Sequence, residues 1–237
     1  MPTSAPYAIP VILHAVRQLR PRSILDIGVG FGKYGLLFRE YLDVWDAAQM
    51  GDIRRTAWTT RIEGIEVSPG YLTPVHDYVY DRVHVGDALD VIDGLGRYDL
   101  VFMGDVLEHF TKDDGRRLVR KLYDHADRCV LLTYPTGSVL RGPVLGNPAE
   151  AHRSTWRRAD FDEYERVAYT VVEDRADVCV IARPPHEPPF LVGCFAARRR
   201  RGWKGRIASA LVNALGPSRA SRLASAFSGE PVVLRAE

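Results

Sequence analysis

The chain has 237 residues, of which 46% are hydrophobic, so it can form one domain with a full core. Its formal net charge of +2 is unevenly spread, because residues 198–237 carry nine Lys or Arg against two Glu and leave residues 1–197 at −5. No apolar run approaches the roughly 20 residues of a membrane span, and no signal-peptide pattern precedes the first expected helix. These features argue against a membrane-spanning protein and lead us to expect a cytoplasmic one, with a mildly acidic body and a basic tail.

The chain begins with an expected helix and a short buried strand. An amphipathic helix is predicted over residues 7–20, where Pro21 stops it, and the strand over residues 24–27. A glycine-rich turn then leads into a second helix that ends near Val44. Residues 45–61 have no clear period and exceed the roughly 2–6 residues typical of such a connection, so they predict an insertion.

Four further strands follow at regular spacing. They are expected over residues 62–66, 82–85, 98–103 and 129–133. One helix is expected through residues 71–78, after Ser68-Pro-Gly, and another through residues 118–125, after Asp113-Asp-Gly. Strands that alternate with helices in this way indicate a parallel α/β sheet with helices on both faces.

The chain beyond the fifth strand is less regular. Residues 134–160 contain several Gly and Pro and predict a loop, and a short helix is expected over residues 161–165. Strand candidates lie at 171–172, 178–182 and 190–197, and the last two should pair as an antiparallel hairpin across residues 184–189. We therefore expect about seven strands in one domain over residues 1–197.

The turn after the first strand carries the most specific signal. It contains Gly30-Phe-Gly32-Lys-Tyr-Gly35, which matches the dinucleotide-binding pattern G-x-G-x-x-G and would favour a nicotinamide-dependent oxidoreductase. The same stretch also contains Asp26-x-Gly28-x-Gly30-x-Gly32. A carboxylate there would repel a pyrophosphate but attract a ligand with an ammonium and a sulfonium group. The pattern resembles motif I of the class I S-adenosylmethionine-dependent methyltransferases, and we prefer that interpretation.

The resemblance covers about residues 20–135 and extends to the tips of the next strands. It implies that Glu66 accepts hydrogen bonds from ribose hydroxyls and that Asp87 receives the adenine amino group, although Asp87 could also cap the following helix. It further implies a Rossmann-like sheet closed by an antiparallel hairpin, with S-adenosylmethionine as cofactor and S-adenosylhomocysteine as product. The cofactor-binding residues implied in this way are Asp26, Gly28, Gly30, Gly32, Glu66, Val67, Asp87, Ala88 and Gly104.

The loop over residues 134–160 is the expected acceptor side of the site. It follows the fifth strand and should lie over the carboxyl edge of the sheet, where it concentrates polar and aromatic groups such as Glu150. We expect a small-molecule or glycan-like acceptor that is methylated at oxygen, which requires alignment and a base. His152 and His109 are the candidate bases, with Asp105 as an orienting or basic partner. The alternative is that His109 is a structural residue at the start of its loop and that His152 fixes its loop through a hydrogen bond.

The three cysteines predict no special chemistry. Cys129, Cys179 and Cys194 each lie in an apolar, strand-like run without metal-ligand spacing. We expect buried thiols in a reducing compartment, with neither a disulfide nor a metal site.

Residues 198–227 combine a run of arginines and Trp203 with apolar residues at helical spacing, which predicts a basic amphipathic helix. Such a helix could contact the inner membrane surface or a lipid-linked substrate, clamp onto a partner, bind nucleic acid non-specifically, or pack on its own domain. The acidic body and the lack of an Asn/Asp-Pro-Pro-Tyr tetrapeptide disfavour nucleic-acid methylation. The alternative to an enzyme is a non-catalytic cofactor-binding module that recruits a partner through this tail.

Overall fold

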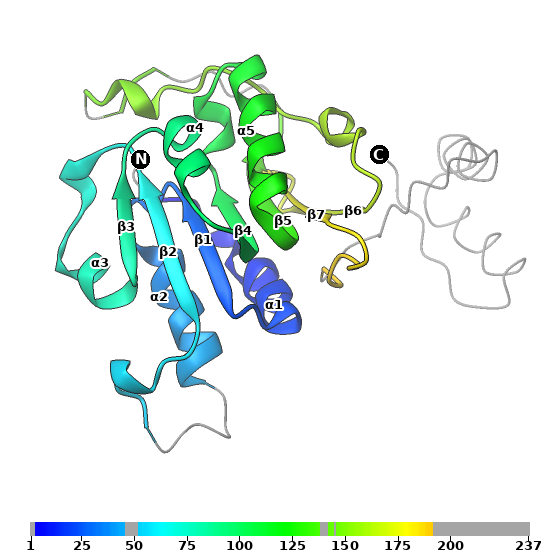
Figure 1. Ribbon diagram of the computed structural model, residues 1–237. Helices are drawn as coiled ribbons and strands as arrows, with labels where there is room; N and C mark the ends of the chain where they lie inside the picture. Colours follow the sequence, from blue (N-terminus) through cyan, green and yellow to red (C-terminus); the bar gives the residue numbers. More distant parts are fainter. Residues whose placement is uncertain (1–2, 46–51, 138–141, 145, 192–237) are drawn as a thin grey trace, which may run out of the picture. The chain divides into compact units, whose positions relative to one another are not determined.

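The computed structural model describes residues 3–45, 52–137, 142–144 and 146–191, and its centre is one seven-stranded sheet (Figure 1). The order of the strands in the sheet is β3-β2-β1-β4-β5-β7-β6. The strands are β1 (Ser23–Ile27), β2 (Arg61–Glu66), β3 (Arg82–Val85), β4 (Tyr98–Gly104), β5 (Ala126–Pro135), β6 (Val167–Val172) and β7 (Ala176–Ala182).

The first five strands are parallel to one another, and β7 runs antiparallel to both of its neighbours, β5 and β6. In the central register, Ile24 of β1 lies opposite Ile62 of β2 on one side and Leu100 of β4 on the other. All five parallel strands therefore end at the same edge of the sheet, and the direction of the strand order reverses between β1 and β4. The predicted parallel sheet with an antiparallel end is confirmed.

Helices cover both faces of the sheet, as predicted (Figure 1). Successive residues of a strand point to opposite faces, so Ile24 packs with Phe38 in one core cluster, while Leu25 packs with Leu122 in the other. The first cluster lies under the α-helices α1 (Ile9–Leu19), α2 (Lys33–Arg39) and α3 (Pro74–Val79), and the second lies under α4 (Ala88–Val91) and α5 (Lys112–His125).

The C-terminal hairpin is not the predicted one. β7 pairs with β5 on one edge and with β6 on the other, so residues 190 and 191 have no edge of β7 left to pair with. The hairpin turn lies at residues 173–175, where Glu173 and Asp174 have φ values of 51° and 54°. Such values usually mark Gly or Asn, so this turn lacked its usual sequence signal. The prediction of a helix over residues 161–165 is also wrong, because the structure has a 3₁₀ turn over Arg158–Phe161 instead.

Several expectations fall partly or wholly outside the described residues. These are the middle of the predicted insertion (46–51), Cys194, and the whole basic tail from residue 198. Cys129 and Cys179 are buried free thiols, as expected. Within the described ranges, no helix has the length and apolar character needed to cross a membrane.

Candidate active site

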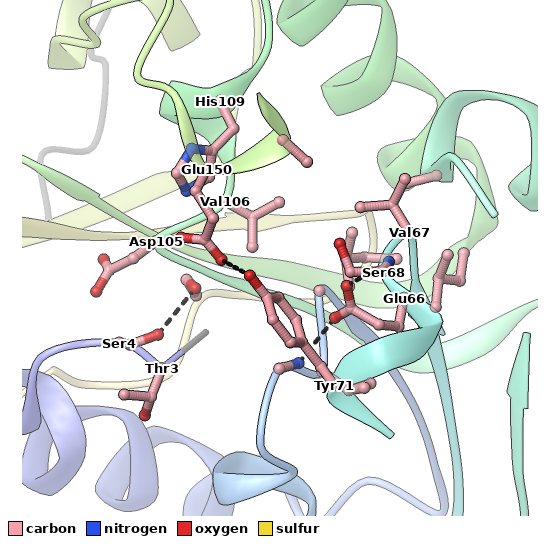
Figure 2. A pocket seen from close by; sticks show the side chains of 18 of the residues that line it. Thr3, Ser4, Glu66, Val67, Ser68, Tyr71, Asp105, Val106, His109 and Glu150 are labelled. Atoms are coloured by element: carbon pink, nitrogen blue, oxygen red, sulfur yellow. Dashed lines mark hydrogen bonds between the residues drawn. The ribbon is translucent and has the colours of Figure 1, made fainter. Parts of the chain in front are cut away.

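A pocket opens at the edge of the sheet where the parallel strands end (Figure 2). It lies where the strand order reverses between β1 and β4, the usual place for a ligand site in an open α/β sheet. Its wall comes from the loops after β1 to β5 and from the segment before α1. The predicted site residues that line it are Gly28, Gly30, Glu66, Val67, Asp87, Ala88, Gly104, Asp105 and His109.

Glu66, at the end of β2, connects the glycine turn to the loop that follows β2. One of its carboxylate oxygens accepts the Gly30 amide at 2.9 Å, and the other accepts the Ser68 amide at 2.9 Å. Burial raises the pKa of Glu66, and the two amide hydrogen bonds oppose that rise. Because a carboxylate has about four acceptor positions, two of them are left for hydroxyl donors in the pocket.

The tight turn after β1 requires glycine at its first position. Gly28 has a φ of 73°, and a Cβ atom there would lie 2.5 Å from Cγ2 of Val106. The backbone of this turn can therefore lie close to a ligand in the pocket. Gly32 has a different place, because it is the N-cap of α2 and does not line the pocket.

Asp26 does not line the pocket, contrary to the predicted contact with a cationic ligand. Its side chain is buried, and its Oδ2 accepts the hydroxyl of Tyr80 at 2.6 Å. The same hydroxyl accepts the Gly35 amide at 3.2 Å. Burial raises the pKa of Asp26 to about 7, the nearby charge of Glu66 adds to this rise, and the Tyr80 hydrogen bond opposes it. Asp26 is thus linked through the Tyr80 hydroxyl to Gly35, the last glycine of the turn pattern, and does not contact the pocket.

Asp87 and Val67 present one polar and one apolar group to the pocket. Asp87 Oδ1 accepts the Leu89 amide at 2.9 Å as the N-cap of α4, so the capping role exists beside the pocket-lining one. Val67 is 49% exposed although it is apolar, which leaves its side chain available to pack on a flat ring. Figure 2 shows Val67 and Asp105 on opposite sides of the pocket.

Asp105 follows β4 in a backbone conformation that is uncommon for residues other than glycine, with a φ of 54°. Its amide donates to the carbonyl oxygen of Thr133 at 3.1 Å and to Oγ1 of Thr133 at 3.0 Å. The Thr133 hydroxyl in turn donates to Asp105 Oδ1 at 2.7 Å. These bonds hold the Asp105 carboxylate at the pocket wall.

Of the two candidate bases, His109 lines the pocket and His152 does not. The centroids of the two rings are 5.0 Å apart. Nδ1 of His109 lies 3.2 Å from the carbonyl oxygen of Ala151, which can only accept, so Nδ1 carries the proton and Nε2 has the lone pair. Burial lowers the pKa of His109, which favours the neutral ring. His109 is therefore the better placed of the two to take a proton from a ligand.

Four polar side chains, here called the clasp, join the loop after β2 to the loop after β5. They are Ser68, Tyr71, Asn147 and Glu150. The Asn147 side-chain amide donates to Oγ of Ser68 at 2.9 Å and to the Tyr71 hydroxyl at 2.8 Å, and that hydroxyl donates to Glu150 at 3.0 Å. The sequence indicated that residues 134–160 face the site, but not that they are tied to residues 68 and 71.

The segment before α1 also contributes to the pocket, which no sequence pattern had indicated. Thr3 and Ser4 line it. The Ser4 hydroxyl donates to the Gly104 carbonyl at 3.0 Å, and the Lys33 ammonium donates to the Ser4 carbonyl. Contacts between residues so far apart in the chain depend on the folded sheet, so no local signal could have revealed them.

No protein-family model and no curated protein matches the sequence. Solved structures match in fold, and three with a TM-score of 0.50 are informative. The DhpI–SAH complex is 16% identical, with 76% of this chain and 86% of that one covered. The methyltransferase domain of bacterial CtHen1-CN is 13% identical, with 75% and 98% covered. A candidate O-methyltransferase from Nostoc punctiforme PCC 73102 is 17% identical, with 74% and 56% covered.

Because these identities are low, the structural similarity establishes a shared fold and leaves the substrate open. The parallel β3-β2-β1-β4-β5 order, the antiparallel β7 and the glycine turn after β1 agree with the arrangement that the sequence resemblance implied. The chain therefore has the fold of the class I S-adenosylmethionine-dependent methyltransferases.

Proposed function

We propose that the chain is an S-adenosylmethionine-dependent methyltransferase. The observation that carries the proposal is the setting of Glu66, a carboxylate with spare acceptor positions between the glycine turn and the exposed apolar side chain of Val67. This setting fits a ligand whose ribose separates a flat base from an amino-acid portion. Glu66 would accept the ribose hydroxyls, Val67 and Ala88 would pack on the adenine, and Asp87 would receive its amino group.

Bound S-adenosylmethionine supplies a methyl group on a sulfonium, which an acceptor takes by in-line displacement. The residues of this chain have to hold both partners in line and exclude water. The backbone around Gly28 and Gly30 and the end of β4 at Gly104 would hold the methionine portion. Asp105 and His109, which line the pocket just beyond β4, would then lie on the acceptor side.

We further propose a small-molecule or glycan-like acceptor that is methylated at a hydroxyl oxygen. The hydroxyl must lose its proton as the new oxygen–methyl bond forms, and a neutral imidazole is suited to accept it. His109 supports this role through its place in the pocket, its Nε2 lone pair and its lowered pKa. Asp105 would orient the acceptor, and His152 would pack against the ring of His109.

Calorimetric titration with S-adenosylmethionine, S-adenosylhomocysteine and NADH tests the cofactor. We expect binding of the first two and none of NADH. Binding of NADH alone would favour the oxidoreductase interpretation of the glycine turn, and no binding of any of the three would refute the proposal.

Transfer of labelled methyl groups to a set of hydroxylated small molecules tests the reaction. Once an acceptor is found, His109→Asn should keep the cofactor affinity and lower turnover by about 10²–10⁴-fold. His186→Asn, at an exposed position outside the pocket, is the matched control. Undiminished turnover in the His109 variant would remove the proposed base.

A further inference from the structure

Beside the pocket, three side chains bring potential metal ligands together. Glu108, His109 and His152 each offer one nitrogen or oxygen atom, and these atoms all lie within 4.8 Å of one another. Nitrogen and oxygen ligands lie about 2.0–2.2 Å from a bound transition-metal ion. Small side-chain rotations would therefore bring the three donors around one ion.

Glu108 gives an independent reason to expect a cation. The residue is 3% exposed, and its Oε2 atom has no hydrogen-bond partner within the part of the chain that the structure describes. A buried carboxylate oxygen without a partner is unfavourable unless a hydrogen bond or a cation compensates it. The charge of nearby Asp105 increases this penalty. A divalent ion at this position would compensate both carboxylates.

The ligand residues are held in place by backbone hydrogen bonds. The Glu108 carbonyl accepts the Arg153 amide at 2.7 Å, which fixes the loop carrying His152 next to residues 108 and 109. Nδ1 of His109 donates to the Ala151 carbonyl at 3.2 Å. A histidine that binds a metal usually donates its other ring N–H to such a carbonyl, which orients the ring and fixes its tautomer.

We propose that Glu108, His109 and His152 bind a divalent transition-metal ion. Two imidazoles and one carboxylate suit Zn²⁺, Fe²⁺, Co²⁺ or Mn²⁺, whereas Mg²⁺ and Ca²⁺ prefer oxygen ligands alone. The proposal departs from the expectation of no metal, which rested on the cysteine spacing. Three protein ligands leave coordination positions open, and His109 places the ion at the pocket wall.

A role for the ion in the reaction rests on the proposed methyltransferase function. With its lone pair on the metal, His109 no longer serves as the base. The acceptor oxygen would instead bind the ion, which lowers the pKa of its hydroxyl so that the proton is released to water. The oxygen then forms its bond to the methyl group as the bond from methyl to sulfur breaks.

Cobalt binding to the full, untagged chain tests the site. The protein is stripped with EDTA, dialysed and titrated with Co²⁺, whose visible absorption bands report coordination by protein ligands. We expect one Co²⁺ per chain, displaced by Zn²⁺. The variants His152→Asn and Glu108→Gln should bind at least about 100-fold more weakly, since even indirect partners of a metal ligand typically account for about 10–100-fold. His186→Asn should bind like the wild type, and far-UV circular dichroism should show that each variant is folded.

Absence of Co²⁺ bands in the wild type, or equal binding by His152→Asn, would overturn the metal site. Titration of the stripped protein with S-adenosylmethionine separates this result from the proposed function. Cofactor binding without metal binding would remove the metal site alone. Metal binding without cofactor binding would leave the site in place and remove the methyltransferase proposal.

Discussion

Replacement of Glu66 by Gln tests the ribose assignment because it keeps the size of the side chain and changes only its acceptors. In the wild type, Oε1 accepts the Ser68 amide and Oε2 the Gly30 amide. Glutamine has one oxygen and one NH₂ donor, so one of these amides would face another donor and an acceptor position for the ribose would be lost. A hydrogen bond to a charged group contributes about 1.5–3 kcal/mol. The Kd for S-adenosylmethionine should therefore rise by about 10- to 150-fold.

Isothermal titration calorimetry measures this change, with Glu165→Gln at an exposed position as the charge-matched control. Thermal unfolding without ligand shows how much of the effect comes from a weakened glycine turn. An affinity of Glu66→Gln within about twofold of the wild type, in a folded variant, would refute the assignment of Glu66 to the ribose.

Three further predictions concern Tyr80, Asp26 and Gly28. Tyr80→Phe should lower the free energy of unfolding by about 1–3 kcal/mol in urea denaturation, because Asp26 loses its hydroxyl donor; an unchanged midpoint would contradict that bond. The folded state keeps the Asp26 proton up to about pH 7, whereas the ordinary pKa is 3.8. Stability from this group is thus complete below pH 3.8 and falls as the pH rises to about 7, by on the order of 4 kcal/mol. Asp26→Asn should flatten this decline in urea denaturation at several pH values, and an identical decline would refute the shift. Gly28→Ala should weaken S-adenosylmethionine binding about tenfold or more in calorimetry, because its φ of 73° and Val106 exclude a side chain; wild-type affinity would show that the turn can relax.

The sheet and the ligand edge could be predicted because their signals are local. The alternating stretch Arg82-Val-His-Val85, for example, coincides with β3 itself. Parallel strands end at a common edge, so Glu66, Asp87 and Gly104 could be assigned to one pocket from their positions after predicted strands.

The features that could not be predicted depend on residues far apart in the chain. The hydroxyl that binds Asp26 belongs to Tyr80, 54 positions later, so the sequence alone suggested a free carboxylate. The partner of β7 was misassigned because the turn at residues 173–175 lacks glycine. His109 and His152 are neighbours only because the loop after β5 folds back onto the end of β4.

The clasp ties the loop after β5 to the same backbone that holds Glu66. The Ser68 amide donates to Glu66, and the Ser68 hydroxyl accepts the side chain of Asn147. Ser68 would therefore be affected by a ligand that changes the hydrogen bonds of Glu66. It would likewise be affected by a ligand that displaces Asn147. Thermodynamic linkage then requires reciprocity, so the factor by which bound cofactor changes the acceptor affinity equals the factor by which bound acceptor changes the cofactor affinity. The two ligands would occupy the pocket as coupled partners, and the measured affinity of each would depend on the concentration of the other.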